Sequence, residues 1–378
     1  MVLATILAAG VFFYARWRFD QIHKAKVADL APRPTQPAAP FDVLLVGSDS
    51  RAFVDNSAQA GQFGSASSVG GQRSDVIIIA RIAPAIHQVK LLSIPRDTYV
   101  DIPGTSDIAG PNRINAAFDN GPTLLVQTIE NSFHIPISDY AEVNFPGFQG
   151  MVDALGGITL NFRYLVKDSY SGLNIDHTGC QTIHGIQALG LVRSRHLEYF
   201  ENGEWLYDGN SDWSRIQRQD AFFRALISKM RGLASSPLGL NSFLGAASKN
   251  LTIDQTLSES VLIHLANVFR GFRSSQFTTE TLPTIPYTTS GGAAVLLPAQ
   301  SPDEQTIGAF LAFGTTKTTA AIRHLQPLGA ARVQLLASTT PTTSNASTVT
   351  TVPHDSTANT PVVYNNETEP WNPTPCSS

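Results

Sequence analysis

The chain has 378 residues, of which 42% are hydrophobic and 15% are charged, and its formal net charge is −4 at pH 7. This length provides for one large domain, or two, with a substantial core. A net negative charge argues against a general nucleic-acid binder, because affinity for a phosphate backbone requires a surplus of lysine and arginine.

The N-terminal segment predicts attachment to a membrane. Residues 2–14 are almost entirely apolar, and we interpret residues 1–19 as an uncleaved anchor, although a spanning helix needs about 20 residues. Basic residues from Arg16 to Lys26 follow this segment. By the positive-inside rule alone they place the rest of the chain in the cytoplasm, unless a basic segment precedes residue 1. Residues 20–40 contain a proline-rich stretch and are interpreted as a linker.

Residues 41–312 are interpreted as one folded body. Apolar runs alternate there with helical spacings, which predicts an α/β fold with a central sheet sandwiched by helices. The expected strands are 41–46, 76–80, 91–94, 140–144, 158–160 and 293–297, and the expected helices are 122–133, 148–155, 185–191, 212–230 and 251–270. Residues 313–378 are rich in Thr, Ser, Ala, Asn and Pro, and we expect this tail to be largely disordered.

Cysteines and glycine motifs restrict the chemistry. Cys180 and Cys376 are the two cysteines, and neither they nor the histidines have the spacing of a zinc site. A disulfide between them is compatible with an exported protein, but Cys376 lies in the predicted tail, so the pairing stays open. The sequence has no Walker loop and no GxGxxG motif after a strand, which argues against nucleotide-driven chemistry.

Polar clusters that contain both arginine and aspartate flank the predicted strands. Arg73 and Asp75 precede one strand, and Arg96 and Asp97 follow the next. Two buried strands would bring these clusters to one edge of a sheet, where open α/β folds bind ligands. Arginine binds two phosphate oxygens through its planar guanidinium group, and Mg²⁺ prefers carboxylate oxygens. The clusters therefore predict an anionic substrate, with a pyrophosphate group as the expected anion.

Asp49 and Asp75 are the candidate metal ligands. Each lies where a predicted strand meets a loop, so the two carboxylates would share one Mg²⁺ if the strands are neighbours. The alternative is that Asp49 caps a turn and Asp75 forms an ion pair with Arg73 or Arg96.

Two further clusters occur later in the chain. Arg193 and Arg195 would project to the same side of an extended backbone and form a double clamp, or else belong to a solvated turn paired with acidic neighbours. Arg215 and Gln219 are four residues apart and therefore adjacent on the predicted helix 212–230, whose N-terminus also attracts anions. The alternative for this helix is a solvated amphipathic face.

In chain order, these clusters resemble the LytR-CpsA-Psr family of bacterial cell-envelope proteins. Seven segments between residues 41 and 230 carry the resemblance: Val46-Gly-Ser-Asp-Ser-Arg51, Gln72-Arg-Ser-Asp75, Leu92-Ser-Ile-Pro-Arg-Asp-Thr98, Arg113-Ile-Asn-Ala-Ala117, Val152-Asp-Ala-Leu-Gly-Gly-Ile158, Gly185-Ile-Gln-Ala-Leu189 with Val192-Arg-Ser-Arg195, and Asp212-Trp-Ser-Arg-Ile-Gln-Arg-Gln219. The chain departs from the family pattern in the long loop between Asp49 and Arg73.

The resemblance implies a central mixed sheet and a phosphotransferase at the cell membrane, with a single anchor and an extracytoplasmic catalytic domain. Such an enzyme moves a glycopolymer from a polyprenyl-pyrophosphate carrier to peptidoglycan and leaves a phosphodiester bond. The Arg- and Ala-rich composition suggests arabinogalactan as the polymer, with a teichoic-acid-like polymer also considered. The alternative is a non-catalytic polyprenyl-phosphate-binding sensor or envelope regulator. A nucleic-acid partner is not expected, because helix 212–230 alternates arginine with aspartate.

The resemblance also implies roles for individual residues. Asp49 and Asp75 would hold Mg²⁺, with Mn²⁺ as the alternative ion. The expected catalytic residues are Arg73, Asp75, Arg96 and Asp97, of which Asp97 is a candidate base or a supporting partner. The expected pyrophosphate-binding residues are Arg51, Arg96, Arg113, Arg193, Arg195, Arg215, Arg218 and Gln219.

Overall fold

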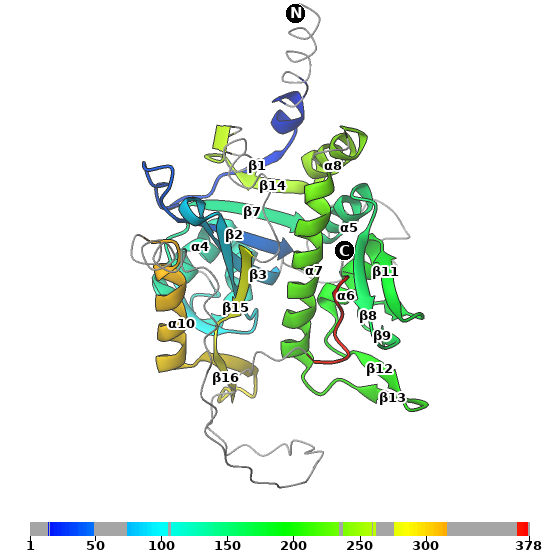
Figure 1. Cartoon of the computed structure of the whole chain (residues 1–378). Coiled ribbons are helices and arrows are strands. Elements are labelled where there is room, and N and C mark those ends of the chain that lie inside the picture. Colours follow the sequence, from blue (N-terminus) through cyan, green and yellow to red (C-terminus); the bar gives the residue numbers. More distant parts are fainter. Residues whose placement is uncertain are drawn as a thin grey trace, which may run out of the picture.

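The computed structural model describes residues 14, 16–48, 74–104, 107–233, 237–258, 260–261, 276–315 and 369–376. A seven-stranded mixed sheet forms its centre (Figure 1). Its order is β1 (His23–Ala25), β14 (Leu251–Asp254), β7 (Asp139–Asn144), β2 (Phe41–Ser48), β3 (Ser74–Ala83), β4 (Gln88–Ile94) and β15 (Phe277–Thr281). The predicted α/β fold with a central mixed sheet is confirmed.

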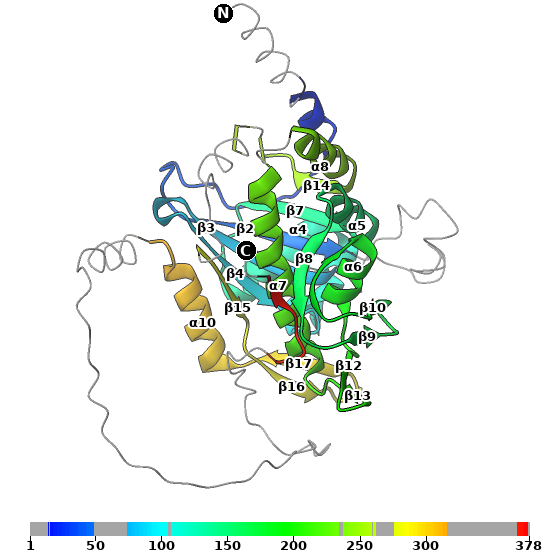
Figure 2. The same cartoon turned by 45° about the vertical axis from the view of Figure 1, so that its right-hand side comes forward.

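Alternating side chains divide the core of this sheet between its two faces. Leu44 and Val46 of β2 face helices α4 (Pro122–Phe133) and α10 (Gln300–Ala312) and belong to one buried cluster. Val43 belongs to a second cluster on the opposite face, which helix α7 (Ser211–Leu233) covers. This alternation follows from the two-residue period of a strand, and it places helices on both faces of the sheet (Figures 1 and 2).

Helix α7 separates the central sheet from a second core. Phe223 of α7 packs against the sheet, whereas Phe222, the preceding residue, is buried in the second core. That core is built from α5 (Phe145–Ala154), α6 (Gly185–Arg193) and two small sheets, one of β11 (Gly179–Ile183), β8 (Ile158–Phe162) and β18 (Thr374–Pro375), the other of β10 (Leu173–Ile175), β9 (Val166–Asp168), β12 (Glu198–Glu201) and β13 (Glu204–Tyr207). One long helix thus fixes the two parts relative to each other.

Short elements complete the fold. Strands β5 (Tyr99–Ile102) and β6 (Gly110–Arg113) form a hairpin, as do β16 (Thr284–Thr288) and β17 (Ala294–Pro298). The remaining elements are helix α8 (Pro237–Asn250), helix α3 (Ile114–Ala117) and the 3-10 helices η1 (Pro84–Ile86) and η2 (Phe118–Asn120).

The predicted helix over residues 251–270 is wrong at its start. Residues 251–254 form strand β14, in which Leu251 pairs with Val143 and Thr252 pairs with Glu142 of β7. The pattern of apolar residues in so short a segment does not separate a strand from a helix, and pairing with β7 decides the outcome. Most of the rest of this predicted helix lies outside the described residues.

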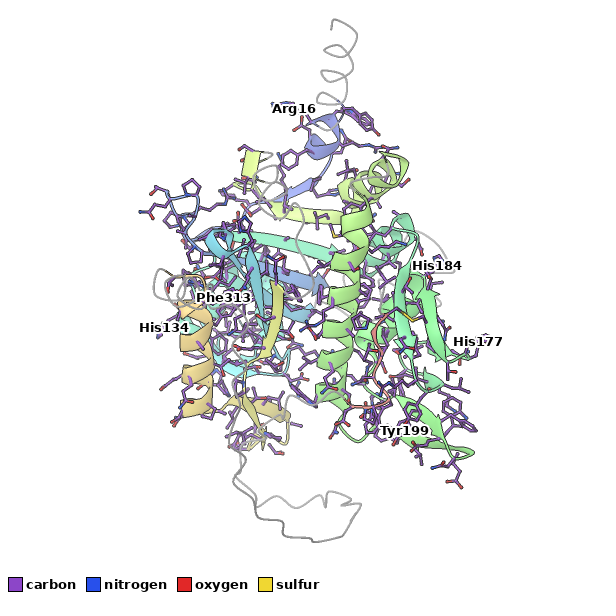
Figure 3. The ribbon with its side chains drawn as sticks, in the orientation of Figure 1. Arg16, His134, His177, His184, Tyr199 and Phe313 are labelled. Atoms are coloured by element: carbon purple, nitrogen blue, oxygen red, sulfur yellow. A yellow bond between two sulfur atoms is a disulfide. The ribbon has the colours of Figure 1, made fainter. Side chains whose placement is uncertain are left out.

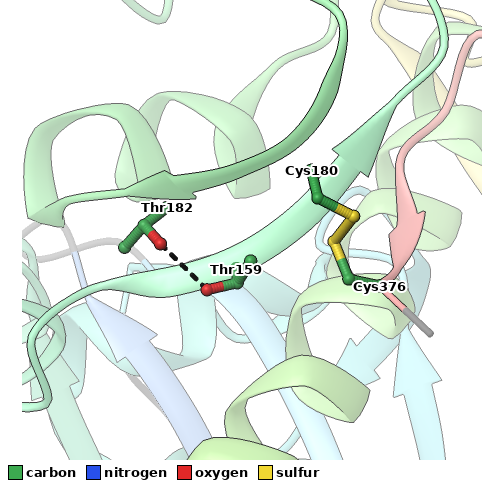
Figure 4. Close-up of a disulfide and its surroundings, with 4 residues drawn as sticks. All are labelled: Thr159, Cys180, Thr182 and Cys376. Carbon is green, nitrogen blue, oxygen red and sulfur yellow. Dashed lines mark hydrogen bonds between the residues drawn. A yellow bond between two sulfur atoms is a disulfide. The ribbon is translucent and has the colours of Figure 1, made fainter. Parts of the chain in front are cut away.

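The last described segment lies within the tail that was predicted to be largely disordered. Its strand β18 pairs with β8, and Cys376 forms a disulfide with Cys180 of β11 (Figure 4). The cysteines are 196 residues apart in sequence. Sequence composition did not predict that this segment is structured, because the segment has no periodic pattern of apolar residues. A disulfide and a few side-chain contacts hold it in place instead.

The predicted N-terminal anchor is mostly outside the described residues, which begin at Tyr14. Within the part of the chain that the structure describes, no helix combines the length and the apolar character needed to cross a bilayer.

Candidate functional site

Strand ends meet at one edge of the central sheet. Ser48 at the end of β2 pairs with Ser74 at the start of β3, and Ile77 of β3 pairs with Ile94 at the end of β4. Arg96 follows β4 by two residues. The topology therefore brings the start of β3 and the end of β4 to the same edge, as the positions of the polar clusters predicted.

A cavity of about 210 Å³ lies beside this edge. Strand β3, the segment after β4, the turn between β9 and β10, the end of α6 and the first turns of α7 contribute its walls. Four arginines line it against one aspartate, an excess of three positive charges. The lining residues are Val76, Arg96, Asp168, Tyr170, Ser171, Val192, Arg193, Arg195, His196, Arg215 and Gln219.

Five residues that were predicted to contact phosphate therefore line one cavity: Arg96, Arg193, Arg195, Arg215 and Gln219. The first and the last of them, Arg96 and Gln219, are more than 120 residues apart in the sequence. A guanidinium group presents several N–H donors in a plane, and it suits phosphate oxygens for that reason. The arrangement is chemically suited to a multiply charged oxyanion.

Arg193 and Arg195 reach the cavity by a geometry that differs from the prediction. Arg193 is the last residue of α6, and Ser194 has the φ of −58° and ψ of 124° that end the helix. The expectation of an extended backbone is wrong at Arg193, because buried Leu189 and Val192 continue the helical period to this point. The Cζ atom of Arg193 lies 4.2 Å from the ring centroid of Phe145, a cation–π contact.

Asp168, at the end of β9, fixes the backbone that carries these arginines. Its Oδ2 accepts hydrogen bonds from the Ser194 hydroxyl at 2.7 Å and from the backbone N–H groups of Arg195 at 3.0 Å and His196 at 2.9 Å. Burial on its own would raise the pKa of Asp168, but these bonds and those from the β9–β10 turn outweigh burial, so the pKa is lowered. The ionised carboxylate is therefore a stable acceptor for this turn.

Arg215 and Gln219 lie one turn apart on α7, as predicted, and both are largely buried. The side-chain amide of Gln219 donates a hydrogen bond of 2.9 Å to the carbonyl oxygen of Val192. Gln219 therefore ties α7 to the last turn of α6, beside Arg193. This contact gives Gln219 a structural task in addition to its position in the cavity wall.

Asp97 links three arginines around the site. Its carboxylate oxygens lie 3.5 Å from Nε of Arg96, 3.5 Å from Nε of Arg113 and 3.8 Å from Nη2 of Arg195. A carboxylate shared between three guanidinium groups limits their mutual repulsion and restricts their positions. Of the two roles expected for Asp97, this geometry favours the supporting partner over the base.

Two predicted phosphate-binding residues do not line the cavity. Arg113 pairs with Asp97 and donates a hydrogen bond of 2.8 Å to the carbonyl oxygen of Ala294. Arg218 is fully buried in an ion pair of 3.1 Å with Asp208. Arg218 was predicted to bind phosphate because it belongs to the same sequence motif as Arg215 and Gln219. On a helix, however, the residue that directly precedes Gln219 faces another direction.

The predicted metal ligands are only partly described. Asp49, Arg51 and Arg73 lie outside the described residues, and Asp75 is described by its backbone in β3 alone. Among the described residues, no group of three or more His, Cys, Asp and Glu is arranged to hold a metal ion. The neighbouring hydroxyls of Ser48 and Ser74 are buried with no hydrogen-bond partner among the described residues.

Four polar lining residues were not identified from the sequence, namely Asp168, Tyr170, Ser171 and His196. Asp168 is the last residue of the short strand β9 and precedes a Ser-Tyr-Ser-Gly turn, so it lies where a strand meets a loop, as Asp49 was predicted to do. The other histidines that the structure describes do not line the cavity. His177 and His184 lie at the outer edge of the second core, with side chains 75% and 67% exposed (Figure 3).

The chain matches known proteins over most of its length. A sequence model of the LytR_cpsA_psr family matches residues 16–306. The probable cell wall biosynthesis protein LcpB of Corynebacterium glutamicum is 33% identical over 289 residues, which cover 74% of this chain and 64% of that protein. The teichoic acid transferase TagU of Enterococcus faecalis is 32% identical over 228 residues, 60% of this chain and 65% of that protein. The chain thus spans slightly less than two thirds of these curated relatives.

Solved structures share the fold. A LytR-Csp2A-Psr enzyme from Actinomyces oris matches with a TM-score of 0.58 and 25% identity over 76% of this chain and 96% of that one. TagV of Bacillus subtilis matches with a TM-score of 0.56 and 24% identity over 73% of this chain and 97% of that one. With the family match extending from the first strands to helix α10, the chain belongs to the LytR-CpsA-Psr family.

Proposed function

We propose that the chain is a phosphotransferase that moves a cell-wall glycopolymer from a polyprenyl-pyrophosphate carrier to peptidoglycan. The observation that carries this proposal is the cavity with four arginines at the edge of the sheet, in a chain of this family. Relatives named teichoic acid transferases support the same reaction class. The donor polymer in this proposal is arabinogalactan or a teichoic-acid-like polymer.

The reaction exchanges a phosphoanhydride bond of the donor for a phosphate ester bond to the acceptor. A hydroxyl oxygen of peptidoglycan forms a bond to the phosphorus that carries the glycopolymer, and the bond from this phosphorus to the bridging oxygen breaks. Polyprenyl monophosphate leaves with the bonding electron pair, and the hydroxyl proton passes to a base. Charge therefore accumulates on the leaving phosphate and on the oxygens of the phosphorus under attack.

The arginines of the cavity suit this change of charge. Arg96, Arg193, Arg195 and Arg215 come from separate segments and surround one small volume, so they bind the diphosphate from several sides. Donors fixed before the reaction stabilise developing charge without reorganising. Asp97 restricts Arg96 and Arg195 through ion pairs, and Asp168 accepts a hydrogen bond from the backbone N–H of Arg195.

Mg²⁺ is proposed as the cofactor, with Asp49 and Asp75 as its protein ligands. The support comes from strand pairing, because Ser48 and Ser74, their sequence neighbours, are directly paired and carry buried hydroxyls with no partner among the described residues. Val76, which follows Asp75, lines the cavity. When bound, the ion would neutralise charge on diphosphate oxygens.

We place the catalytic domain outside the cytoplasm, attached to the cell membrane. Support comes from the Cys180–Cys376 disulfide, because disulfides persist in oxidising compartments and are rare in the cytosol. Peptidoglycan, the proposed acceptor, lies in the same compartment.

Transfer of a labelled glycan tests the proposal. The purified chain is incubated with Mg²⁺, peptidoglycan fragments and a short-chain polyprenyl pyrophosphate that carries a radiolabelled saccharide, and label in peptidoglycan is counted. We expect transfer by the wild type, loss of at least 100-fold (about 2.7 kcal/mol of barrier) in Arg96→Ala, and wild-type rates in Arg163→Ala, an exposed arginine away from the cavity.

Binding without transfer would contradict the proposal. Tight binding of the lipid donor with no turnover on any acceptor would identify a polyprenyl-phosphate sensor. Equal transfer by wild type and Arg96→Ala would remove the arginine cavity as the reaction site.

A further inference from the structure

The last described segment of the chain, residues 369–376, lies against α7 on the side away from the central sheet (Figure 2). We name residues 369–376 the C-terminal latch. Besides its disulfide and its pairing with β8, the latch places Trp371 on Tyr199, with ring centroids 4.5 Å apart and planes at 6°. Figure 3 shows Tyr199 beside this segment. Glu369 accepts a hydrogen bond from the side chain of Asn210.

The latch also inserts a polar side chain beside the start of α7. Asn372 is 2% exposed. Its Nδ2 donates a hydrogen bond of 2.7 Å to Gln217, and its Oδ1 accepts one of 2.7 Å from Nη1 of Arg218. Both partners are adjacent residues of α7, so Asn372 joins the latch to the helix that carries Arg215 and lines the cavity.

Arg218 connects the latch to the cavity. Its Nη2 donates a hydrogen bond of 2.8 Å to the carbonyl oxygen of Ser194, and its Nη1 is shared between Asn372 and Asp208. Ser194 lies between Arg193 and Arg195, which both line the cavity. One buried guanidinium therefore contacts the latch at one end and the backbone of the arginine pair at the other.

The burial of Arg218 makes this contact sensitive to the latch. A buried cation is tolerated when its donors meet acceptors, and Asp208 and Asn372 are the side chains that meet Nη1. Without Asn372, Asp208 alone holds this end of the guanidinium, and the opposite end loses its fixed distance from Ser194. The spacing of Arg193 and Arg195 would then vary.

We propose that Asn372 and Arg218 are positioning residues, and that the disulfide-fastened latch sets the anion affinity of the cavity. This inference rests on the proposed function, in which the cavity holds the donor diphosphate. Because Cys180 and Cys376 must be oxidised for the latch to close, the cavity becomes fully assembled only in an oxidising compartment.

A disulfide that only stabilises the fold would have a different effect on pyrophosphate binding. Closing a loop of 196 residues removes entropy from the unfolded chain and raises the melting temperature, but it does not change the affinity of molecules that are already folded. Affinity measured well below the melting temperature of every variant therefore separates positioning from general stability.

Isothermal titration with inorganic pyrophosphate in the presence of Mg²⁺ tests the latch on the full chain. We expect Asn372→Ala to raise the Kd for pyrophosphate about tenfold, as loss of one hydrogen bond to a charged group would. Asn372→Asp keeps an acceptor for Arg218 and should restore most of the affinity. Lys249→Ala, a change of an exposed residue on α8 that does not line the cavity, is the control.

The disulfide gives a second, independent arm. Cys180→Ser with Cys376→Ser should raise the Kd in the same direction, and the oxidised wild type should lose affinity when treated with a thiol reductant, whereas the double variant should not respond. In transfer assays the latch variants should raise KM more than they lower kcat, because the contact is to groups that bind the donor.

The outcomes separate the two proposals. Wild-type protein that binds pyrophosphate with the same Kd as Asn372→Ala and the cysteine double variant would overturn the latch and leave the proposed function standing. Wild-type protein that does not bind pyrophosphate would overturn the diphosphate cavity and, with it, the latch.

Discussion

The hydroxyl of Ser194 donates a hydrogen bond of 2.7 Å to the carboxylate of Asp168. The guanidinium group of Arg218 donates a hydrogen bond to the backbone carbonyl oxygen of Ser194. Ser194 is thus held at both its side chain and its backbone. These contacts fix the backbone of its neighbours, Arg193 at the last residue of α6 and Arg195 beyond the end of the helix.

Asp168→Asn should destabilise the protein by about 2 kcal/mol at pH 7, because hydrogen bonds from five donors to a charged acceptor are weakened or lost. The pKa of Asp168 is lowered in the folded state, so its contribution to stability is complete above the ordinary pKa of an aspartate, about 4, and is lost as the pH falls through the folded value. Urea unfolding at several pH values measures the difference between wild type and variant.

The difference should shrink below about pH 4. A difference that stayed constant from pH 7 to pH 3, or one that grew on acidification, would show that the charge of Asp168 does not stabilise this turn.

Arg218→Met should cost about 3–5 kcal/mol, because it leaves the carboxylate of Asp208 buried without its cationic partner. Arg218→Met combined with Asp208→Asn should recover part of this loss, since the second change removes the unpaired charge. A double-mutant cycle by urea unfolding gives the coupling between the two side chains. Strict additivity of the two single changes would contradict the buried ion pair.

Arg193→Lys tests whether the shape of the guanidinium matters as well as its charge. We expect the Kd for pyrophosphate to rise roughly fivefold to tenfold, because an ammonium group cannot donate two parallel hydrogen bonds and packs less well on Phe145. Titration calorimetry measures this change, with Arg163→Lys as the matched exposed substitution. Equal affinity of wild type and Arg193→Lys would reduce the role of Arg193 to a point charge.

Much of the fold follows from local patterns in the sequence. The apolar runs that became β2, β3 and β4 and the spacing that became α4 belong to long segments with a clear period, and such segments retain their type in the folded chain. Short segments do not. Strand β14 depends on pairing with β7, which is distant in sequence, so its local residues do not predict it.

The residues of the site likewise divide into those that the sequence predicted and those that only the fold reveals. Arg96, Arg193, Arg195, Arg215 and Gln219 belong to motifs, and resemblance to a family identified them. Asp168 and Asn372 act by accepting hydrogen bonds inside the fold, and their sequence contexts are ordinary turns. Arg218 is the opposite case, because it belongs to a motif but is buried inside the fold and does not line the cavity.

Removal of Mg²⁺ by a chelator should abolish pyrophosphate binding, and added Mg²⁺ should restore it, because the proposed ion would neutralise diphosphate oxygens that the arginines alone leave charged. Asp75→Asn should raise the Mg²⁺ concentration needed for half-maximal binding by roughly tenfold or more. Binding of pyrophosphate at unchanged affinity in excess chelator would contradict the metal proposal while leaving the arginine cavity intact.

A crystal structure of the protein with a short-chain polyprenyl pyrophosphate would show whether the arginine cavity binds the donor diphosphate. We expect the diphosphate to lie in the cavity beside the start of β3, with its oxygens within hydrogen-bond distance of Arg96, Arg193, Arg195 and Arg215. A diphosphate bound on another surface of the protein, with these four arginines unchanged and in contact with solvent alone, would contradict it.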